Sequence, residues 1–270
     1  MTKKTETKAK ILLLDIETAP ALVYSWGLFK QNIGINQIVR DGYVLMWCAK
    51  WLHDKKIMSD TLVNYSKHLP GATRTCEDLE KLEHHIAKSI WKLVDEADIV
   101  VTQNGEQFDL LWLNTMFLKH HLPPVSTYKS VDTLREAKKT QRFISNKLDY
   151  MARKLDLGRK IDTGGFELWT GCMNGDLKSW YRMEMYCKND VKVLERIYLR
   201  LRPFMILHPN LGTFADDADM HCPNCGSTRI QRKGFFYTAV SKFQRFLCVD
   251  CGKNIRDTKR VFGAKGVAIR

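Results

Sequence analysis

The segment ILLLDIET, residues 11–18, decides the fold of this chain. Its apolar half predicts a buried strand, and on a strand the residues at i and i+2 point to the same side. Asp15 and Glu17 should therefore leave one end of this strand together. Two carboxylates directed at one point suit a hard divalent cation such as Mg²⁺, whose other positions water or substrate phosphate can fill. The segment thus predicts a metal site that cleaves phosphodiester bonds.

Length and composition are sufficient for a large core. The chain has 270 residues, of which 44% are apolar, enough for a domain of about 200 residues with a smaller module beside it. No apolar stretch approaches the roughly 18 uninterrupted residues of a membrane span. The polar start Met1–Lys10 lacks the apolar centre of a signal peptide. We expect an intracellular protein, cytoplasmic or nucleoid-associated, that is not secreted and has no membrane partner.

Strand and helix patterns alternate along most of the chain. Short apolar runs predict strands at 11–15, 43–50, 57–63, 98–102 and 128–132. Amphipathic stretches predict helices at 76–96, 108–120, 146–155 and 176–201, the last with room for a bend between two helices. This order predicts the α/β class, with a mixed sheet flanked by helices.

The composition changes after residue 207, where turn-forming and acidic residues replace apolar periodicity. We therefore expect a polar N-terminal tail at 1–10 and a main domain at 11–207. A linker at 208–220 should follow, then a small metal-binding module at 221–256 and a basic tail at 257–270.

Two further acidic positions extend the pair in the first strand. Asp109 ends the segment NGEQFD, residues 104–109, and should lie in the first turn of a helix. Tyr186 and Asp190 are spaced i and i+4 in a helical segment, so they should share one helix face. Four carboxylates from separate elements can hold two cations roughly 3.5–4 Å apart, which activate a water and stabilise in-line attack on phosphorus. The tyrosine hydroxyl would orient that water.

Each acidic motif alone also has a purely structural interpretation. The first pair could face solvent, Asp109 could favour a helix N-terminus through the helix dipole, and Asp190 could pair with Lys188 or Lys192. Three such motifs in this order, each beside an apolar flank, would rarely occur together by chance. We therefore prefer the metal site.

Together these motifs resemble those of the DnaQ-like 3′–5′ exonucleases of the DEDD superfamily, which have a ribonuclease H-like fold. The tyrosine at 186 is similar to that of the tyrosine-type branch, which includes proofreading domains of family B DNA polymerases. The resemblance spans roughly Ile11 to Arg202 and implies that residues 11–207 form an exonuclease domain. It implies two catalytic Mg²⁺ or Mn²⁺ ions. Asp15, Glu17 and Asp190 would bind the first ion, and Asp15 would bridge to the second, which Asp109 would hold largely through water. Tyr186 would position the nucleophilic water.

A second metal site is predicted near the C-terminus. Two C-x-x-C-G motifs contain Cys222 with Cys225 and Cys248 with Cys251, and 22 residues separate them. This spacing suits a structural Cys₄ zinc site with a β-hairpin between the two knuckles, which is a zinc ribbon. The glycines should allow positive φ and direct backbone amides toward the thiolates. Redox dithiols are the alternative, but neither pair opens a helix after a strand.

The ribbon region carries much of the positive charge. Residues 221–270 contain 11 Lys/Arg and 2 Asp/Glu, so +9 of the chain's net +13 lies there. Such a field favours nucleic acid as partner through counterion release. Arg232, Lys233, Lys242 and Arg245 alternate with aromatic residues and are our candidates for contacts to single-stranded nucleic acid, although some aromatics should form the ribbon's core. Lys259, Arg260, Lys265 and Arg270 could add phosphate contacts.

Other conspicuous residues receive structural interpretations. We expect Asp132 to be accessory or structural, the pairs His84-His85 and His120-His121 to lie at the surface, and the tryptophans, including Trp112 and Trp169, to pack in the interior.

The sequence therefore predicts a two-metal 3′–5′ exonuclease that acts on DNA, with single-stranded 3′ ends as substrate and a zinc ribbon that assists binding. The chain has no room for a polymerase, so it would act alone or beside a separate polymerase. A 3′–5′ exoribonuclease and a catalytically silent nucleic-acid-binding protein on an exonuclease scaffold remain as alternatives, because sugar selection depends on contacts to the 2′ position that motifs do not place.

Overall fold

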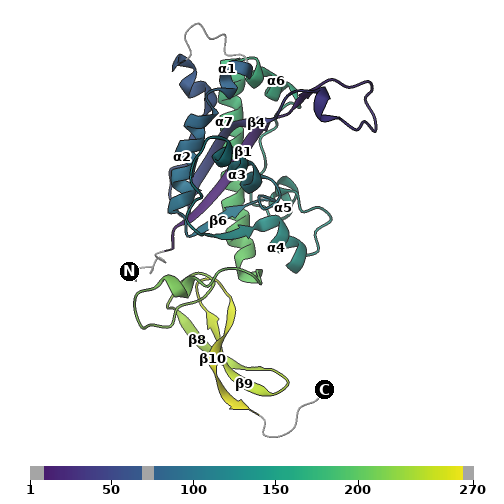
Figure 1. Ribbon diagram of the computed structural model, residues 1–270. Coiled ribbons are helices and arrows are strands. Elements are labelled where there is room, and N and C mark those ends of the chain that lie inside the picture. The colour runs from purple at the N-terminus through teal and green to yellow at the C-terminus, as the bar shows by residue number, and fades with distance from the viewer. Residues whose placement is uncertain (1–8, 69–75, 264–270) are drawn as a thin grey trace. The chain divides into compact units, whose positions relative to one another are not determined.

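The computed structural model describes residues 9–68 and 76–263 (Figure 1). The predicted N-terminal tail, apart from its last two residues, and the tail residues Lys265 and Arg270 lie outside this range. Contacts divide the chain into two compact units, one formed by Lys10–Tyr198 and the other containing the residues from Leu199 onward. Among the described helices, none combines the length and the apolar character needed to cross a bilayer.

A five-stranded mixed sheet forms the centre of the larger unit. Its strand order is β5-β4-β1-β6-β7. The β1–β4 and β4–β5 pairs are antiparallel, whereas β6 is parallel to both β1 and β7. The strands are β1 (Ile11–Ala19), β4 (Tyr43–Trp51), β5 (Met58–Thr61), β6 (Ile99–Thr102) and β7 (Lys129–Asp132). The α/β class, the mixed sheet and the expected strand positions are thus confirmed.

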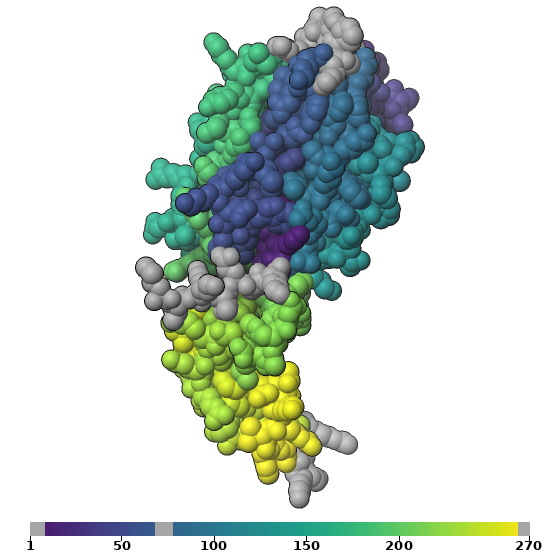
Figure 2. Space-filling view, turned by 90° about the vertical axis from the view of Figure 1, so that its left-hand side faces the viewer, coloured from purple at the N-terminus to yellow at the C-terminus, as the bar shows by residue number. Residues whose placement is uncertain are grey.

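Helices cover both faces of this sheet. Figures 1 and 2 place α7 (Leu177–Leu201) and α3 (Asp109–Lys119) on opposite sides. Every residue of β4 except the last is buried, as expected for a strand covered on both faces. The core side of α7 repeats at helical spacing, with Trp180, Met183, Cys187, Val191 and Leu194 all buried.

The remaining helices differ in part from the predictions. The expected helix at 76–96 is two helices, α1 (Cys76–Glu80) and α2 (Glu83–Glu96), whereas the possible bend in 176–201 is absent and α7 is continuous. The sequence predicted α3 and α5 (Leu148–Lys154) but not α4 (Thr133–Thr140) or α6 (Glu167–Met173). A 3-10 helix, η2 (Leu62–His68), follows β5 directly.

Between β1 and β4 the chain forms a projecting segment, residues 20–42, that we call the arm. It contains β2 (Leu22–Val23), η1 (Ile35–Gln37) and β3 (Ile38–Arg40), and the two short strands pair antiparallel. Figure 1 shows the arm extending away from the sheet. Trp26 within it is 97% exposed, so the expectation that the tryptophans pack in the interior is wrong for this residue.

The smaller unit contains a three-stranded antiparallel sheet in the order β10-β9-β8. The hairpin expected between the two cysteine pairs is formed by β8 (Ile230–Tyr237) and β9 (Ser241–Cys248). The third strand, β10 (Asn254–Gly263), follows the second cysteine pair and was not predicted. Two 3-10 turns, η3 (Arg202–Phe204) and η4 (Leu211–Phe214), precede this sheet.

Candidate active site and zinc ribbon

The predicted acidic residues come together on β1, α3 and α7. Asp15 and Glu17 lie two residues apart on β1, and a ligand atom of each lies within 4.8 Å of the other and of Cys187 Sγ on α7. A register shift against β4 falls between Glu17 and Thr18. Asp109 and Asp190 are not members of that three-residue group, but both raise the pKa of Asp15 through their charge.

Asp109 is the first residue of α3 and is bonded directly to β1. Its Oδ1 accepts a hydrogen bond from Ile16 N at 3.1 Å. The parallel pairing of β1 with β6 covers only Ile11, Leu12 and Leu13, so Ile16 lies beyond the end of that ladder. The Asp109 carboxylate therefore satisfies a strand amide and at the same time lies beside the acidic pair.

Further contacts of the site involve α7 and Lys160, which lies in the loop between α5 and α6. Tyr186 and Asp190 share a helix face as predicted, and both contact Lys160: its Nζ donates to Tyr186 Oη at 3.0 Å and forms an ion pair with Asp190 Oδ2. The other oxygen, Asp190 Oδ1, is buried and has no hydrogen-bond partner in the described structure. Cys187 Sγ lies 3.6 Å from Asp15 Oδ2.

Burial raises the pKa of each acid in this cluster, and repulsion from other members adds to the shift of Asp15 and Glu17. Burial is the largest cause for all four. It raises the pKa of Glu17 to about 8, with the charge of Asp190 adding to the effect, and the pKa of Asp109 to about 7. The pKa values of Asp15 and Asp190 are also raised, and Lys160 opposes the shift in both cases. Concentrated negative charge without a matching number of cations is typical of a site that binds a cation.

A comparison with protein families identifies the fold. A family model described as RNase_H superfamily matches residues 49–202, more than half of the chain. The chain belongs to the RNase H superfamily. The match includes Asp109, Tyr186 and Asp190, while Asp15 and Glu17 precede it. Membership of this superfamily supports a nuclease-type hydrolase activity and nucleic-acid binding.

Comparisons with individual proteins add less. Among solved structures, the family B DNA polymerase from the hyperthermophilic archaeon Pyrobaculum calidifontis is similar to the chain, with 14% sequence identity and a TM-score of 0.49. The match covers 72% of this chain and 25% of the polymerase. The search of curated proteins gives no match.

RNase H-like nucleases use divalent metals, and the residues present fit such ions. Asp15, Glu17, Asp109 and Asp190 offer only oxygen ligands, which are the ligands that Mg²⁺ and Mn²⁺ prefer. Among the described residues, Asp190 Oδ1 is a buried acceptor without a donor, and such an atom is costly unless it binds something. A cation bound here would also stabilise the ionised form of these carboxylates, whose pKa values are raised.

Two residues of this cluster were missed at the sequence level. Lys160 lies in the loop between α5 and α6, where no periodicity marks it. Cys187 lies one residue after Tyr186, and burial raises its pKa far above the usual range, so it remains a thiol. Asp132, by contrast, has the structural role expected of it, because it caps α4 by accepting hydrogen bonds from Leu134 N and Arg135 N.

The four cysteines of the smaller unit form a second cluster. The sulfurs of Cys222, Cys225, Cys248 and Cys251 all lie within 4.8 Å of one another. Two of the separations are 3.7 Å, between Cys222 and Cys251, and 3.6 Å, between Cys225 and Cys248. A tetrahedral zinc site with Zn–S bonds of about 2.3 Å has an S–S edge of about 3.8 Å. The cluster therefore fits one structural zinc ion.

The two knuckles have the backbone form that the sequence predicted, with one correction. Gly226 and Gly252 have φ values of 76° and 74°. Their amides, however, donate to the carbonyl oxygens of Cys222 and Cys248, at 2.8 and 2.9 Å, and not to sulfur. The amides that bond the sulfurs belong to neighbouring residues, namely Asn224, Cys225, Ser227 and Lys253. A side-chain amide also contributes, since Asn224 Nδ2 lies 3.4 Å from Cys251 Sγ.

The candidate nucleic-acid contacts lie on β8 and β9. Arg232 and Lys233 are exposed, Lys242 Nζ lies 3.7 Å from the centre of the Phe235 ring, and Arg245 Nε donates to Lys233 O at 2.8 Å. The unexpected strand β10 adds Arg256, whose guanidinium lies 4.3 Å from the ring centre of Phe243. The sheet thus carries cation–aromatic pairs from all three of its strands.

Proposed function

We propose that this chain is a two-metal-ion 3′–5′ exonuclease that hydrolyses DNA. One observation carries the proposal: three buried carboxylates and the half-buried Asp15, from three elements, converge with raised pKa values, and Asp190 Oδ1 has no donor among the described residues. A folded protein keeps such an arrangement at a cost in stability, which a function can explain. Superfamily membership supports nuclease chemistry for it.

The residue roles proposed here are those that the resemblance to the DnaQ-like exonucleases implies. Asp15, Glu17 and Asp190 would hold one Mg²⁺ or Mn²⁺ ion, and Asp15 with Asp109 the other. When bound, the ions supply an activated water and stabilise negative charge at phosphorus. Tyr186 would position that water through its hydroxyl. Lys160 holds this hydroxyl and Asp190 in place by bonding both, and Cys187 restrains Asp15.

The 3′ polarity and the preference for DNA rest on the three sequence motifs and their resemblance to tyrosine-type proofreading domains. The same carboxylates would hydrolyse RNA equally well, because the contacts that test the 2′ position lie outside the metal site. An exoribonuclease is therefore the alternative activity. The intact set of acids weighs against a silent scaffold.

We further propose that the cysteine cluster binds one structural zinc ion and that the three-stranded sheet of β8, β9 and β10 assists nucleic-acid binding. We keep the predicted limits as part of this proposal: exonuclease domain 11–207, linker 208–220 and ribbon 221–256. A separate DNA polymerase is the protein partner that the motifs suggest.

The test is a Mg²⁺ and Mn²⁺ titration on 5′-labelled single-stranded DNA and RNA of the same sequence. The expected product is a metal-dependent ladder that shortens from the 3′ end, with DNA cleaved faster. Asp15→Ala should abolish the ladder and leave folding intact, whereas Asp54→Ala, at an exposed acid away from the cluster, should cleave like the parent.

Three results would change the proposal. Equal cleavage by Asp15→Ala would remove the metal mechanism. Faster cleavage of RNA would move the assignment to an exoribonuclease. Binding without any cleavage, over the whole metal range, would favour the silent scaffold.

A further inference from the structure

The arm, residues 20–42, has no role in the exonuclease mechanism, yet it exposes an unusual amount of aromatic surface. Tyr24, Trp26 and Phe29 are 75%, 97% and 84% exposed. Leu28 and Ile35 beside them are also almost entirely exposed. Large exposed apolar surfaces of this kind mark sites of interaction, because leaving them in water is unfavourable.

The charge pattern of the arm favours a polyanionic partner with flat apolar groups. Within the arm Lys30 and Arg40 are cationic, and Asp41, next to its end, is the single acidic residue. The side-chain amides of Asn32 and Asn36 can donate to and accept from base edges, whereas those of Gln31 and Gln37 bond the backbone of the arm itself. Single-stranded nucleic acid is bound by this combination, since bases stack on aromatic rings and phosphates meet cations.

A cavity of about 540 Å³ lies where the arm joins the body. Leu22, Val39 and Arg40 line it from the arm, and residues near the start of α2 and the end of α3 complete it. Two of its cations make few polar contacts. The Arg40 guanidinium lies 5.4 Å from the centre of the Tyr43 ring, and its Nε has no hydrogen-bond partner among the described residues. Lys81, largely exposed, forms an ion pair with Asp78 at 3.4 Å.

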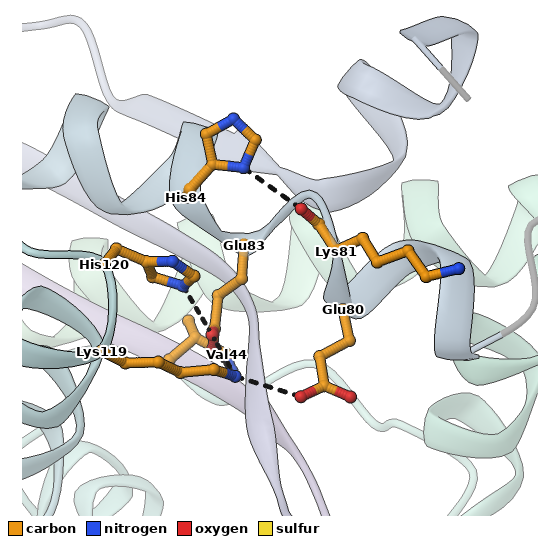
Figure 3. A network of polar contacts seen from close by, with 7 residues as sticks. All are labelled: Val44, Glu80, Lys81, Glu83, His84, Lys119 and His120. Carbon is orange, nitrogen blue, oxygen red and sulfur yellow. Dashed lines mark hydrogen bonds and ion pairs between the residues drawn. The ribbon is translucent and has the colours of Figure 1, made fainter.

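The carboxylates at this cavity are already neutralised, as Figure 3 shows. Glu83 is buried and accepts hydrogen bonds from Val44 N at 2.9 Å and from Lys119 Nζ at 3.0 Å. His120 Nε2 lies 2.9 Å from the same carboxylate, so the expectation that His120 is a surface residue is wrong. Glu80 is paired with Lys119 as well. Lys81 is therefore an exposed cation that phosphate groups can reach, while the half-buried Arg40 guanidinium contributes its charge from the wall of the cavity.

The arm is tethered close to the acidic cluster by the chain itself. It begins directly after β1, the strand that carries Asp15 and Glu17. Trp26 is the ninth residue after Glu17, which limits the distance between them to roughly 30 Å. A strand with its 3′ end at the carboxylates can therefore reach the arm with its next few nucleotides.

We propose that the arm binds single-stranded nucleic acid, with the bases stacked on Tyr24, Trp26 and Phe29 and the phosphates near Arg40 and Lys81. The location of the 3′ end at the carboxylates rests on the proposed function, whereas the binding of the strand by the arm does not.

The experiment measures binding of a fluorescein-labelled oligo(dT) in the Asp15→Ala background, so that no cleavage occurs. The triple variant Tyr24→Ala/Trp26→Ala/Phe29→Ala should bind at least tenfold more weakly, with an unchanged dependence on salt. Arg40→Gln should bind more weakly and lower the salt slope by about 0.7, because one phosphate contact to a single strand is lost. The control Leu118→Ala/Tyr181→Ala removes two exposed apolar side chains elsewhere and should bind like the parent.

A second measurement locates the contact. Oligonucleotides with 4-thiothymidine at single positions counted from the 3′ end are irradiated with the protein, and the crosslinked peptide is identified. Crosslinks to residues 20–42 from the first few positions are expected. Unchanged affinity of the triple variant would overturn the proposal. So would self-association of the parent, measured by light scattering, that the triple variant loses without a change in affinity for oligo(dT). A parent that binds through the arm but cleaves nothing would refute the nuclease and leave the arm's role standing.

Discussion

At the scale of single residues, Lys160 is the side chain whose function most needs a test. Its ammonium forms an ion pair with Asp190, a proposed metal ligand, so it competes with a cation for that carboxylate. We predict that Lys160→Met lowers the Mg²⁺ concentration for half-maximal cleavage by about tenfold, the factor that corresponds to one pKa unit.

The same variant should be less stable without metal. Asp190 would lose its charged partner while buried, at a cost of roughly 1–3 kcal/mol in the free energy of unfolding. Urea unfolding in the absence of Mg²⁺ measures this cost. If Lys160→Met requires more Mg²⁺ than the parent, Lys160 does not compete with the metal for Asp190. Lys160 would then act by contacting the substrate.

Tyr186 offers a second test at this scale. Its hydroxyl accepts from Lys160 at 3.0 Å and also bonds the Asp190 carboxylate. Because the hydroxyl is proposed to act on the water, Tyr186→Phe should lower the rate of cleavage by about 10–100-fold, while the Mg²⁺ requirement changes far less. Tyr181→Phe, on the exposed side of the same helix, is the matched control. A changed metal requirement with an unchanged maximal rate would show that the hydroxyl acts on metal binding.

The difference between what spacing could and could not predict is clear for these residues. The i, i+2 pair on β1 and the i, i+4 pair on α7 were found because a regular element turns a spacing into a shared face. Lys160 was not found, because the spacing of residues in a loop does not predict which side chains meet. Its partner Asp190 lies 30 residues further along the chain. The contact of Cys187 with Asp15 was equally inaccessible, because it depends on the packing of α7 against β1.

At the scale of elements, the zinc ribbon can be tested apart from the acidic cluster. Cys225→Ser removes one of four sulfurs that lie at tetrahedral spacing, so the three-stranded sheet should lose its anchor. We predict weaker binding to oligo(dT) and a smaller salt slope, because the cations of β8, β9 and β10 lose their arrangement. Zinc content by atomic absorption should fall from one ion per chain.

The matched control for this variant lies in the second knuckle. Val249 lies between the two cysteines there and its side chain is partly exposed, so Val249→Ala should keep the zinc and the affinity. Retained affinity and salt slope in Cys225→Ser would limit the ribbon to contacts with proteins.

The elements that the sequence missed share physical causes. The strand β10 contains Arg256, Lys259 and Arg260, and such a density of charge suggested a tail. The arm was missed because its apolar residues follow neither a period of 2 nor one of 3.6 over a useful length, and only two short strands form in it. The helix α4 has only two apolar residues, Leu134 and Ala137, and buries the polar Thr133 and Glu136, so its core face carries little apolar signal in the sequence.

At the scale of the whole molecule, the acidic cluster should couple stability to pH. The pKa values of Glu17 and Asp109 rise to about 8 and about 7 in the folded chain, from ordinary values near 4. Between about pH 4 and pH 8 the folded state therefore holds more protons than the unfolded state, and its stability falls as pH rises through this range. We predict that the metal-free protein loses stability between about pH 4 and pH 8.

Urea unfolding from pH 5 to pH 9, followed by the fluorescence of the buried tryptophans, measures this loss. Mg²⁺ should restore stability at the alkaline end, where the carboxylates are ionised and free to bind it. Asp15→Asn removes one charge from the cluster, so its stability should depend less on pH. A stability that is flat or rises over this range would contradict the raised pKa values.

The hydrogen bond from Ile16 N to Asp109 Oδ1 gives the molecule a built-in spectroscopic reporter. A backbone proton shared with a carboxylate resonates at a position set by the charge on that carboxylate. The amide signal of Ile16 in a nitrogen–proton correlation spectrum should therefore move when Asp109 is protonated and move again when Mg²⁺ arrives. Loading of the site can then be followed at one strand position, without substrate and without any added probe.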